Sequence, residues 1–259
     1  MAPLLILLMF LLSPHARTGC SQAPHLPAFL SEEIIGGQEA KPHSRPYMAF
    51  IQFWDGNQRK RCGGVLVRKT FVLTAAHCKG SSINVTLGAH NIQEQEKTQQ
   101  VIHVRRSIPH PDYIPHNFSN DIMLLQLKRK AKLTKDVQPL RLHEDMTQVN
   151  PGDTCLVAGW GKMAPSGPSA TKLQEVQLTV QDEQKCKAAL HVYSEVTEIC
   201  VGDPRKKKTS FKGDSGGPLV CNKMIQGIFS YGRNSGRPPV VFMKVSHFLP
   251  WIKSTMGHL

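Results

Sequence analysis

From about residue 34 onward, short runs rich in β-branched and aromatic residues alternate with turn residues such as glycine, proline and asparagine. Runs of this length and composition predict β-strands. The first set is Tyr47–Phe53, Gly64–Val67, Phe71–Thr74, Ile83–Gly88, Gln100–Val104 and Ile122–Leu127; the second is Thr154–Ala158, Leu173–Val180, Pro218–Val220, Ile225–Tyr231 and Val240–Val245. Regularly spaced short strands with turns between them are typical of β-sandwiches and β-barrels.

The charged stretch Lys128–Asp136 separates the two sets of strands and has the character of a crossover. The pattern becomes helical only near the C-terminus, where Ser246 is the expected N-cap. Apolar residues recur there at helical spacing: Phe248, Trp251, Ile252 and Met256. The sequence therefore predicts an all-β fold of two barrels, at about 34–135 and about 136–245, followed by a helix at about 246–259.

The N-terminal residues differ in character from the rest of the chain. Leu4–Leu12 is an unbroken apolar run with the length of a secretory signal's hydrophobic region, although no Lys or Arg precedes it. A buried helix is the alternative. We expect a signal peptide at residues 1–19, and export would place the seven cysteines in an oxidising compartment. Sequons at Asn84 and Asn117 agree with a secretory route and predict N-glycosylation.

Composition limits the class of protein further. Hydrophobic residues make up 40% of the 259 residues, which excludes wholesale disorder, and Gly and Pro are too few for a collagen-like chain. No apolar run reaches about 18 residues, so the sequence predicts no transmembrane segment. The formal net charge of +13 indicates a strongly basic protein.

Three short strings contain the residue types of nucleophilic catalysis. His77 follows a predicted strand, Asp121 precedes another, and Ser215 lies in the glycine-lined loop Gly213–Pro218. A serine hydroxyl is a weak nucleophile that needs a base, imidazole is suited to that task near neutral pH, and a carboxylate fixes the imidazole tautomer. We predict that His77, Asp121 and Ser215 are catalytic. The backbone N–H groups of Gly213 and Ser215 form the predicted oxyanion hole.

These strings, with five longer ones, make the chain resemble the chymotrypsin-type serine proteases from Ile34 to the C-terminus. Within that family it is similar to the granzymes of cytotoxic lymphocytes, granzymes B and H in particular. The strings are IIGGQEAKPHSRPYMAF, SSINVTLGAHNI, NFSNDIMLLQL, TEICVGDP and TSFKGDSGGPLVC. The resemblance implies a trypsin-like fold, with two packed antiparallel six-stranded β-barrels and a C-terminal α-helix. It also implies a serine endopeptidase that works through an acyl-enzyme with no cofactor and no metal ion.

The resemblance also implies how the cysteines pair, which the spacing alone does not decide. The implied disulfides are Cys62–Cys78, Cys155–Cys221 and Cys186–Cys200. The seventh cysteine, Cys20, lies before Ile34 and would be discarded with the leader.

Activation follows from the same resemblance. Ile34 matches the new N-terminus that such zymogens expose, and its α-ammonium would pair with the carboxylate of Asp214. Residues 20–33 would form an extra leader and activation propeptide that ends in Glu32-Glu33. This acidic pair resembles the dipeptide that a dipeptidyl peptidase removes from granzymes, so an activating dipeptidyl peptidase is an implied partner.

Five residues match positions that bind substrate in the family: Thr209, Ser210, Ser230, Gly232 and Val240. Thr209 at the pocket base provides no carboxylate, so cleavage after Lys or Arg is not expected. Granzyme B, which cuts after Asp, has an arginine where this chain has Val240, and an unpaired buried carboxylate is costly. We expect an apolar, medium-sized pocket for Leu, Met or Phe before the scissile bond. The alternative is a granzyme B-like, Asp-specific protease in which the loops override these positions.

Positive charge is gathered in four clusters. They are Arg59-Lys60-Arg61, Arg105-Arg106, Lys128-Arg129-Lys130 and Arg205-Lys206-Lys207-Lys208. Together they favour binding of acidic proteoglycan, whereas no motif for specific nucleic-acid recognition is present. The resemblance further implies protein substrates, serpin inhibitors, and a place in the secretory pathway, in cytolytic granules and outside the cell. The alternative of another class is a catalytically silent, basic glycan-binding homologue.

Overall fold

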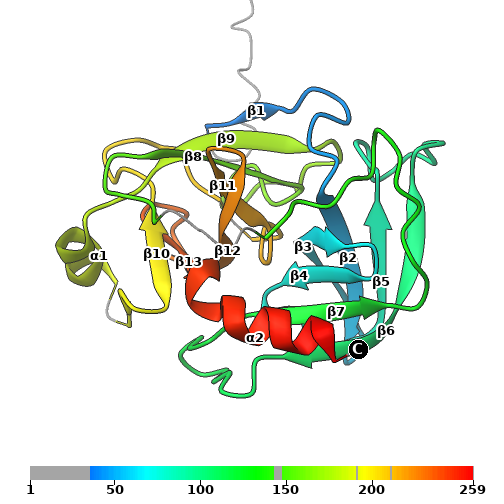
Figure 1. The fold of residues 1–259 in the computed structure, drawn as a ribbon. Coiled ribbons are helices and arrows are strands. Elements are labelled where there is room, and N and C mark those ends of the chain that lie inside the picture. Colours follow the sequence, from blue (N-terminus) through cyan, green and yellow to red (C-terminus); the bar gives the residue numbers. More distant parts are fainter. Residues whose placement is uncertain (1–35, 143–147, 191, 211, 259) are drawn as a thin grey trace, which may run out of the picture. The chain divides into compact units, whose positions relative to one another are not determined.

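The computed structural model describes residues 36–142, 148–190, 192–210 and 212–258. The predicted signal peptide, the propeptide and Ile34 lie outside the described residues. The architecture is mostly β, with two groups of strands and a helix at the C-terminal end (Figure 1).

The first group is a closed barrel of six antiparallel strands in the order β2-β3-β4-β7-β6-β5. Their bounds are β2 (Met48–Asp55), β3 (Gln58–Arg68), β4 (Phe71–Thr74), β5 (Ser81–Leu87), β6 (Gln100–Pro109) and β7 (Met123–Leu127). A two-residue turn that contains Gly56, at φ +55°, connects β2 to β3. Such turns need positive φ, which glycine adopts without strain. The inward residues of the strands fill the barrel with aliphatic side chains.

The second group is a seven-stranded sheet in the order β1-β9-β8-β11-β12-β13-β10. Its strands are β1 (Gln38–Glu39), β8 (Thr154–Gly159), β9 (Gln174–Thr179), β10 (Glu198–Val201), β11 (Pro218–Cys221), β12 (Met224–Gly232) and β13 (Val240–Lys244). A bridge between Val180 and Val201 joins the end of β9 to β10, so the six strands β8 to β13 curve back on themselves. These six strands correspond to the second predicted barrel, and β1 extends it although it precedes the first barrel in sequence.

Helix α2 (Val245–Gly257) is the predicted C-terminal helix, but its first turn differs from the prediction. Lys244 is the N-cap and makes no side-chain capping bond, so the prediction of Ser246 as N-cap is wrong. Strand β13 leads directly into the helix at Lys244, which leaves Ser246 inside the first turn. No helix in the described part of the chain is long and apolar enough to cross a membrane.

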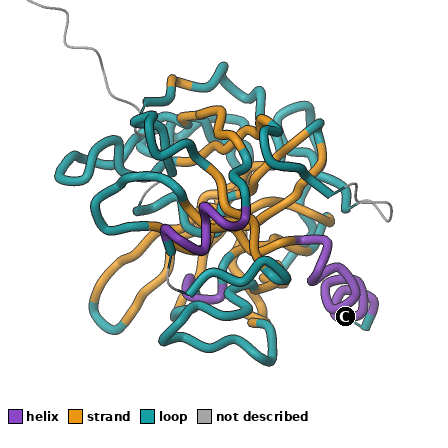
Figure 2. Tube along the Cα trace, turned by 90° about the vertical axis from the view of Figure 1, so that its left-hand side faces the viewer, coloured by secondary structure: helices purple, strands orange, loops and turns teal. Residues whose placement is uncertain are grey.

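Helix α1 (Glu183–Ala189) and the 3-10 turn η1 (Ala76–Cys78) were not predicted. Helix α1 has only seven residues, of which Cys186 is buried, so it shows no helical periodicity. Its N-cap Asp182 accepts hydrogen bonds from the N–H groups of Gln184 and Lys185 at 3.0 and 3.4 Å. In Figure 2 most of the strands lie in the interior, and loops run around them.

Candidate active site

His77 and Asp121 come from neighbouring strands of the first barrel. His77 lies in η1, directly after β4, and Asp121 lies two residues before β7, which pairs with β4. The Nδ1 of His77 is 2.7 Å from Oδ2 of Asp121, and the backbone N–H of His77 donates to Oδ1 at 2.8 Å. The pairing of β4 with β7 therefore brings together two residues that are 44 positions apart.

The Asp121 carboxylate is fully buried and receives a third donor from the second barrel. The Ser230 hydroxyl, on β12, donates to Oδ2 at 2.5 Å. A carboxylate that faces Nδ1 selects the tautomer that carries its proton there, and leaves Nε2 as an acceptor. The His77 side chain is 24% exposed, so the ring is open to a substrate.

The loop before Asp121 is conformationally unusual. Phe118 and Asn120 have φ of +59° and +54°, a region that asparagine tolerates and a bulky residue rarely adopts. The Phe118 ring meets His77 edge-on, with centroids 5.7 Å apart, and stacks on Tyr231 at 5.8 Å. Strain of this kind persists where surrounding contacts determine the conformation, and it is common at functional sites.

The Ser215 loop lies where the two barrels meet. The Ser215 carbonyl accepts a hydrogen bond from the N–H of Gly63, on β3, at 2.7 Å, and Sγ of Cys78 is 3.8 Å from the same oxygen. The N–H of Gly216 donates to the Phe229 carbonyl on β12 at 2.8 Å. The backbone around Ser215 is thus hydrogen-bonded to both barrels and lies beside Cys78, the residue after His77.

Glycine is required at Gly213, one of the two predicted oxyanion donors. Its φ is +103°, and a Cβ there would be 2.9 Å from Cα of Gly161. Any side chain would therefore displace the backbone that presents the Gly213 and Ser215 N–H groups.

Asp214 is buried in a recess made by two glycines that the sequence analysis did not single out. Its Oδ1 accepts the N–H of Gly161 at 2.8 Å, and the residue is fully buried. A Cβ on Gly159 would come within 2.2 Å of that oxygen, and one on Gly161 within 2.5 Å of the carboxyl carbon. The absence of side chains at both positions is what makes room for the carboxylate.

The predicted pocket residues are gathered at the ends of β12 and β13 and on the loop before Ser215. Thr209 and Ser210 are fully buried, and no partner for the Ser210 hydroxyl lies among the described residues. Val240 pairs with Gly232 across the two strands, and a Cβ on Gly232 would be 2.6 Å from a Val240 methyl carbon. The Val240 side chain thus lies over Gly232 and reduces the space between the strands.

The structure contains three disulfides, Cys62–Cys78, Cys155–Cys221 and Cys186–Cys200, which are the pairings that the resemblance implies. The first fastens η1, and with it His77, to β3. The sulfur atoms of Cys62 and Cys78 and a ring nitrogen of His77 lie within 4.8 Å of one another. Metal ligation by cysteine needs a thiolate, and these two sulfurs are bonded to each other, so the group does not fit a metal ion.

The two sequons lie on the first barrel. Asn84 is half-buried on β5, opposite Gln52 and His103. Asn117 is half-buried in the loop before Asp121, and its Oδ1 accepts the N–H of Ser119 at 3.0 Å. Glycosylation at either position stays a prediction.

One acidic residue near this site, Glu198, escaped the sequence analysis. Glu198 is buried on β10, 3% exposed, and its Oε2 accepts the Tyr231 hydroxyl at 3.1 Å. Burial is the largest influence and raises the pKa of Glu198 to about 6, while hydrogen bonds from Ser194 and Tyr231 oppose the rise. The available signal was a lone glutamate directly before the apolar run Ile199–Val201, since a charge in a buried strand is rare without a partner.

Comparison with known proteins identifies the family of this chain. A family model described as Trypsin matches residues 34–252. The chain belongs to the trypsin family. Human (Homo sapiens) granzyme B is 63% identical over 257 residues, covering 99% of each chain, and human granzyme H is 64% identical over 260 residues, covering 100% of each.

Solved structures give the same result. A chain described as "Structure of GrC" matches with a TM-score of 0.84 and 55% identity, covering 86% of this chain and 99% of that one. This trypsin-family chain is therefore a granzyme-like serine endopeptidase, which acts on protein substrates. The predictions of fold class, family and enzyme class are confirmed.

Proposed function

We propose that His77, Asp121 and Ser215 carry out peptide hydrolysis through an acyl-enzyme. The Ser215 Oγ attacks the scissile carbonyl carbon while its proton passes to Nε2 of His77. Collapse of the tetrahedral intermediate expels the amine, which takes that proton. Water then attacks the acyl group, gives a proton to His77, and releases the acid as Ser215 regains its own.

The observation that supports this most directly is the contact of His77 with the buried Asp121, with Nδ1 and Oδ2 2.7 Å apart. It orients the ring and stabilises the imidazolium that forms when Ser215 loses its proton. The N–H groups of Gly213 and Ser215 would bind the developing oxyanion, an interaction worth about a hundredfold or more in rate per donor.

A fluorophosphonate probe tests the assignment, because it labels only an activated serine. After removal of residues 1–33, we expect labelling that Ser215→Ala abolishes, together with peptide hydrolysis. Ser254→Ala, at an exposed serine of α2, is the matched control and should be labelled like the wild type. Labelling that survives Ser215→Ala would show that another residue is the nucleophile.

For specificity we propose a preference for Leu, Met or Phe before the scissile bond. The supporting feature is the buried Val240 over Gly232, which narrows the pocket and offers no positive charge. Granzyme B-like specificity for Asp would need a cation in this place. We also propose the secretory route and the cytolytic-granule role of a granzyme for this chain, on the strength of its similarity to granzymes B and H.

A second proposal, polyanion binding, is favoured by a groove between the first barrel and α2. Five basic residues line it, and none of its described lining residues is acidic: Arg68, Lys69, Lys130, Arg141 and Lys253. Concentrated positive charge attracts sulfated glycans, and the attraction weakens steeply as salt rises. We propose acidic proteoglycan as the ligand of this groove.

Elution from immobilised heparin tests the groove. Arg68→Glu with Arg141→Glu should lower the eluting salt concentration clearly more than a matched double charge reversal at Lys41 and Lys223, which are exposed and outside the groove. Equal shifts in the two double variants would mean that net charge alone binds the glycan.

A further inference from the structure

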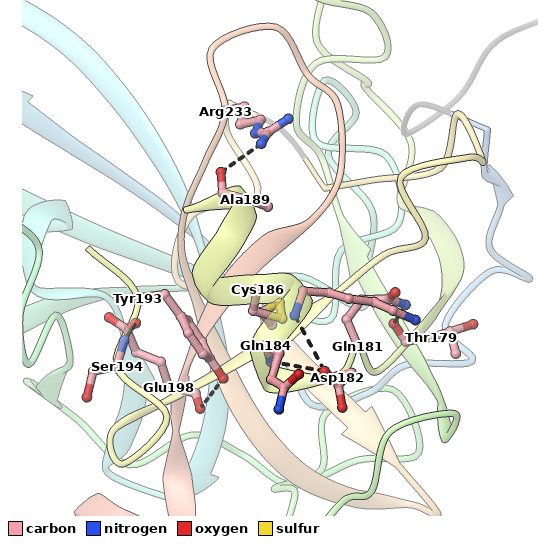
Figure 3. Close-up of a disulfide and its surroundings, with 12 residues drawn as sticks. Thr179, Gln181, Asp182, Gln184, Cys186, Ala189, Tyr193, Ser194, Glu198 and Arg233 are labelled. Atoms are coloured by element: carbon pink, nitrogen blue, oxygen red, sulfur yellow. Dashed lines mark hydrogen bonds between the residues drawn. A yellow bond between two sulfur atoms is a disulfide. The ribbon is translucent and has the colours of Figure 1, made fainter. Parts of the chain in front are cut away.

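A buried carboxylate beside the catalytic residues has no role in the mechanism described above. Glu198 lies on β10, and its Oε2 accepts two hydrogen bonds, from the N–H of Ser194 at 2.8 Å and from the Tyr231 hydroxyl at 3.1 Å. Its own backbone carbonyl accepts the Tyr193 hydroxyl at 3.4 Å. Figure 3 shows Glu198 beside Tyr193 and Ser194, close to helix α1.

The Tyr231 ring is the link between Glu198 and the active site. It stacks on Phe118 with ring centroids 5.8 Å apart and planes 30° from parallel, and Phe118 in turn meets His77 edge-on. Tyr231 also lies between Ser230 and Gly232, the two β12 residues that match the substrate-lining strand. The two rings therefore form a wall that runs from His77 along the expected path of the peptide.

The same end of β12 has a second attachment, which goes to α1. The Arg233 side chain donates to the Ala189 carbonyl at 2.7 Å, a contact drawn in Figure 3. Helix α1 is itself joined to β10 by the Cys186–Cys200 disulfide. Glu198 and Arg233 thus connect β12 to β10 and α1, which the disulfide joins to each other. The position of Glu198, and through it that of Tyr231, is therefore fixed.

The surroundings of Glu198 show that its charge is not there for stability. Among the described residues, the titratable groups around it include the Tyr193 and Tyr231 hydroxyls, Asp121 from the first barrel, Glu183 from α1 and Lys244 from β13. The Lys244 Nζ donates to the Glu195 carbonyl, so it is engaged by that loop. A buried carboxylate without a close cation costs free energy that glutamine would avoid, but hydrogen bonds to a carboxylate are about twice as strong as neutral ones.

We propose that Glu198 is a positioning residue for specificity: through Tyr231 it fixes the aromatic wall on which residues upstream of the scissile bond bind. The inference rests on the proposed protease function, and what it adds is the role of Glu198 in positioning Tyr231. The favoured substrates are extended peptides with an apolar side chain that packs on Phe118 and Tyr231. A single-residue substrate does not reach beyond the pocket and gains nothing from the wall.

The test compares two substrates, a tetrapeptide amide with Leu before the cut and a single-residue Leu ester. Removing the Tyr231 hydroxyl with Tyr231→Phe should lower the ratio of kcat/KM for the tetrapeptide to kcat/KM for the ester by about fivefold, mainly through the tetrapeptide KM. Tyr193→Phe is the matched control, because it removes a hydroxyl bonded to the backbone of Glu198 rather than to its carboxylate. That variant should leave the ratio at the wild-type value.

Variants of Glu198, combined with Tyr231→Phe, form a double-mutant cycle that tests whether the two residues act together. Glu198→Ala should lower the ratio as Tyr231→Phe does, Glu198→Gln should recover part of it, and the double variant Glu198→Ala/Tyr231→Phe should be no worse than either single variant. Equal losses on both substrates, or equal effects of Tyr193→Phe and Tyr231→Phe, would overturn the proposal and leave the protease function standing. A wild-type protein that hydrolyses neither substrate would refute the function and this inference together.

Discussion

At the scale of single residues, the Asp121 carboxylate shows how the two barrels depend on each other. Two of the groups that hydrogen-bond to this carboxylate belong to His77, in the first barrel. The third is the hydroxyl of Ser230, in the second barrel. A hydrogen bond to a buried charged group is worth about 1.5–3 kcal/mol, and its loss leaves the carboxylate less firmly oriented.

Ser230→Ala should therefore lower kcat by about tenfold and change KM little, because the backbone of β12 is unaffected. Steady-state kinetics on the tetrapeptide measure both constants. A rise in KM at constant kcat would show instead that the hydroxyl contacts substrate.

Glu198 predicts an unusual pH dependence of stability. Burial raises its pKa from 4.5 to about 6, so the folded state binds the proton more tightly than the unfolded state. The fold therefore gains stability as pH falls from above 6 to below 4.5, by about 2 kcal/mol. Glu198→Gln has no such charge. Measured by urea unfolding, the free energy of unfolding of this variant should exceed that of the wild type by up to about 2 kcal/mol at pH 7.5, and the difference should vanish at pH 4. An advantage of equal size at both pH values would contradict the assignment.

The side chain at position 240 should determine which substrate residue is preferred before the scissile bond. Val240→Arg would introduce a cation over Gly232, where this chain has a methyl group. A desolvated ion pair is worth several kcal/mol, so the variant should shift the ratio of kcat/KM for Asp over Leu tetrapeptides by at least about tenfold. Val240→Lys has the same charge without the planar guanidinium and serves as comparison. A wild type that already prefers Asp would show that a base elsewhere sets the preference.

Residue types and their neighbours in sequence were enough to predict His77, Asp121 and Ser215 as candidates, because their chemistry is local to short strings. Contacts that depend on distant segments were not predictable in this way. The Ser230–Asp121 bond joins positions 109 apart, and the recess around Asp214 depends on Gly159, the last residue of β8, and on Gly161 just after it.

At the scale of elements, His110 is one of the residues through which helix α2 contacts the first barrel. The His110 ring, which follows β6, lies edge-on to Phe248 and Trp251 of α2 with centroids 5.2 and 4.9 Å apart. Burial lowers the pKa of His110, with a smaller contribution from His247, while Asp112 opposes the shift. The folded state therefore favours the neutral ring.

Because the folded pKa lies below the unfolded value of 6.5, stability should fall as pH drops through 6.5 and level off below the folded pKa. His110→Phe keeps a ring against α2 and removes the proton, so its Tm should change less than that of the wild type between pH 7 and pH 5. The same Tm dependence in both proteins would place the titrating group elsewhere.

Strands with alternating or continuous apolar residues were predicted close to their observed bounds, for example Phe71–Thr74 in β4. The first half of β3 was missed because Gln58–Arg61 is polar and exposed, so pairing with β2 rather than burial holds it in place. Strand β10 was missed since it has only four residues and begins with the charged Glu198, which leaves the short apolar run Ile199–Val201.

At the scale of the whole described fold, the chain contributes its first strand to the second sheet and only then forms the first barrel. Strand β1 pairs with β9 of the second sheet, and β2 then begins the first barrel. The sequence predicted two barrels from two sets of strands, but not this exchange, because a two-residue exposed strand has no hydrophobic pattern. The consequence is that the segment just after Ile34 is fixed to the barrel that also carries Asp214 and Ser215.

That arrangement supports activation by a new N-terminus. The recess around Asp214 holds a fully buried carboxylate next to the nucleophile, and a buried carboxylate requires compensation by charge or hydrogen bonds. An α-ammonium on Ile34, freed by removal of Glu32-Glu33, would supply a positive charge close to the Gly213–Ser215 loop. Breaking such a buried pair costs about 3–5 kcal/mol, enough to leave the loop disordered in the precursor.

A chain that still carries Glu32-Glu33 should therefore be inactive, and removal of the dipeptide should activate it at least about a hundredfold on the tetrapeptide. The free α-amino group has a pKa of about 8, and pairing raises it in the folded enzyme. Activity that depends on the pair is then complete below pH 8 and declines above the raised pKa. Acetylation of the mature N-terminus is the matched control, since it removes the charge without lengthening the chain, and it should abolish activity. Full activity in either the extended or the acetylated chain would show that Asp214 is stabilised without Ile34.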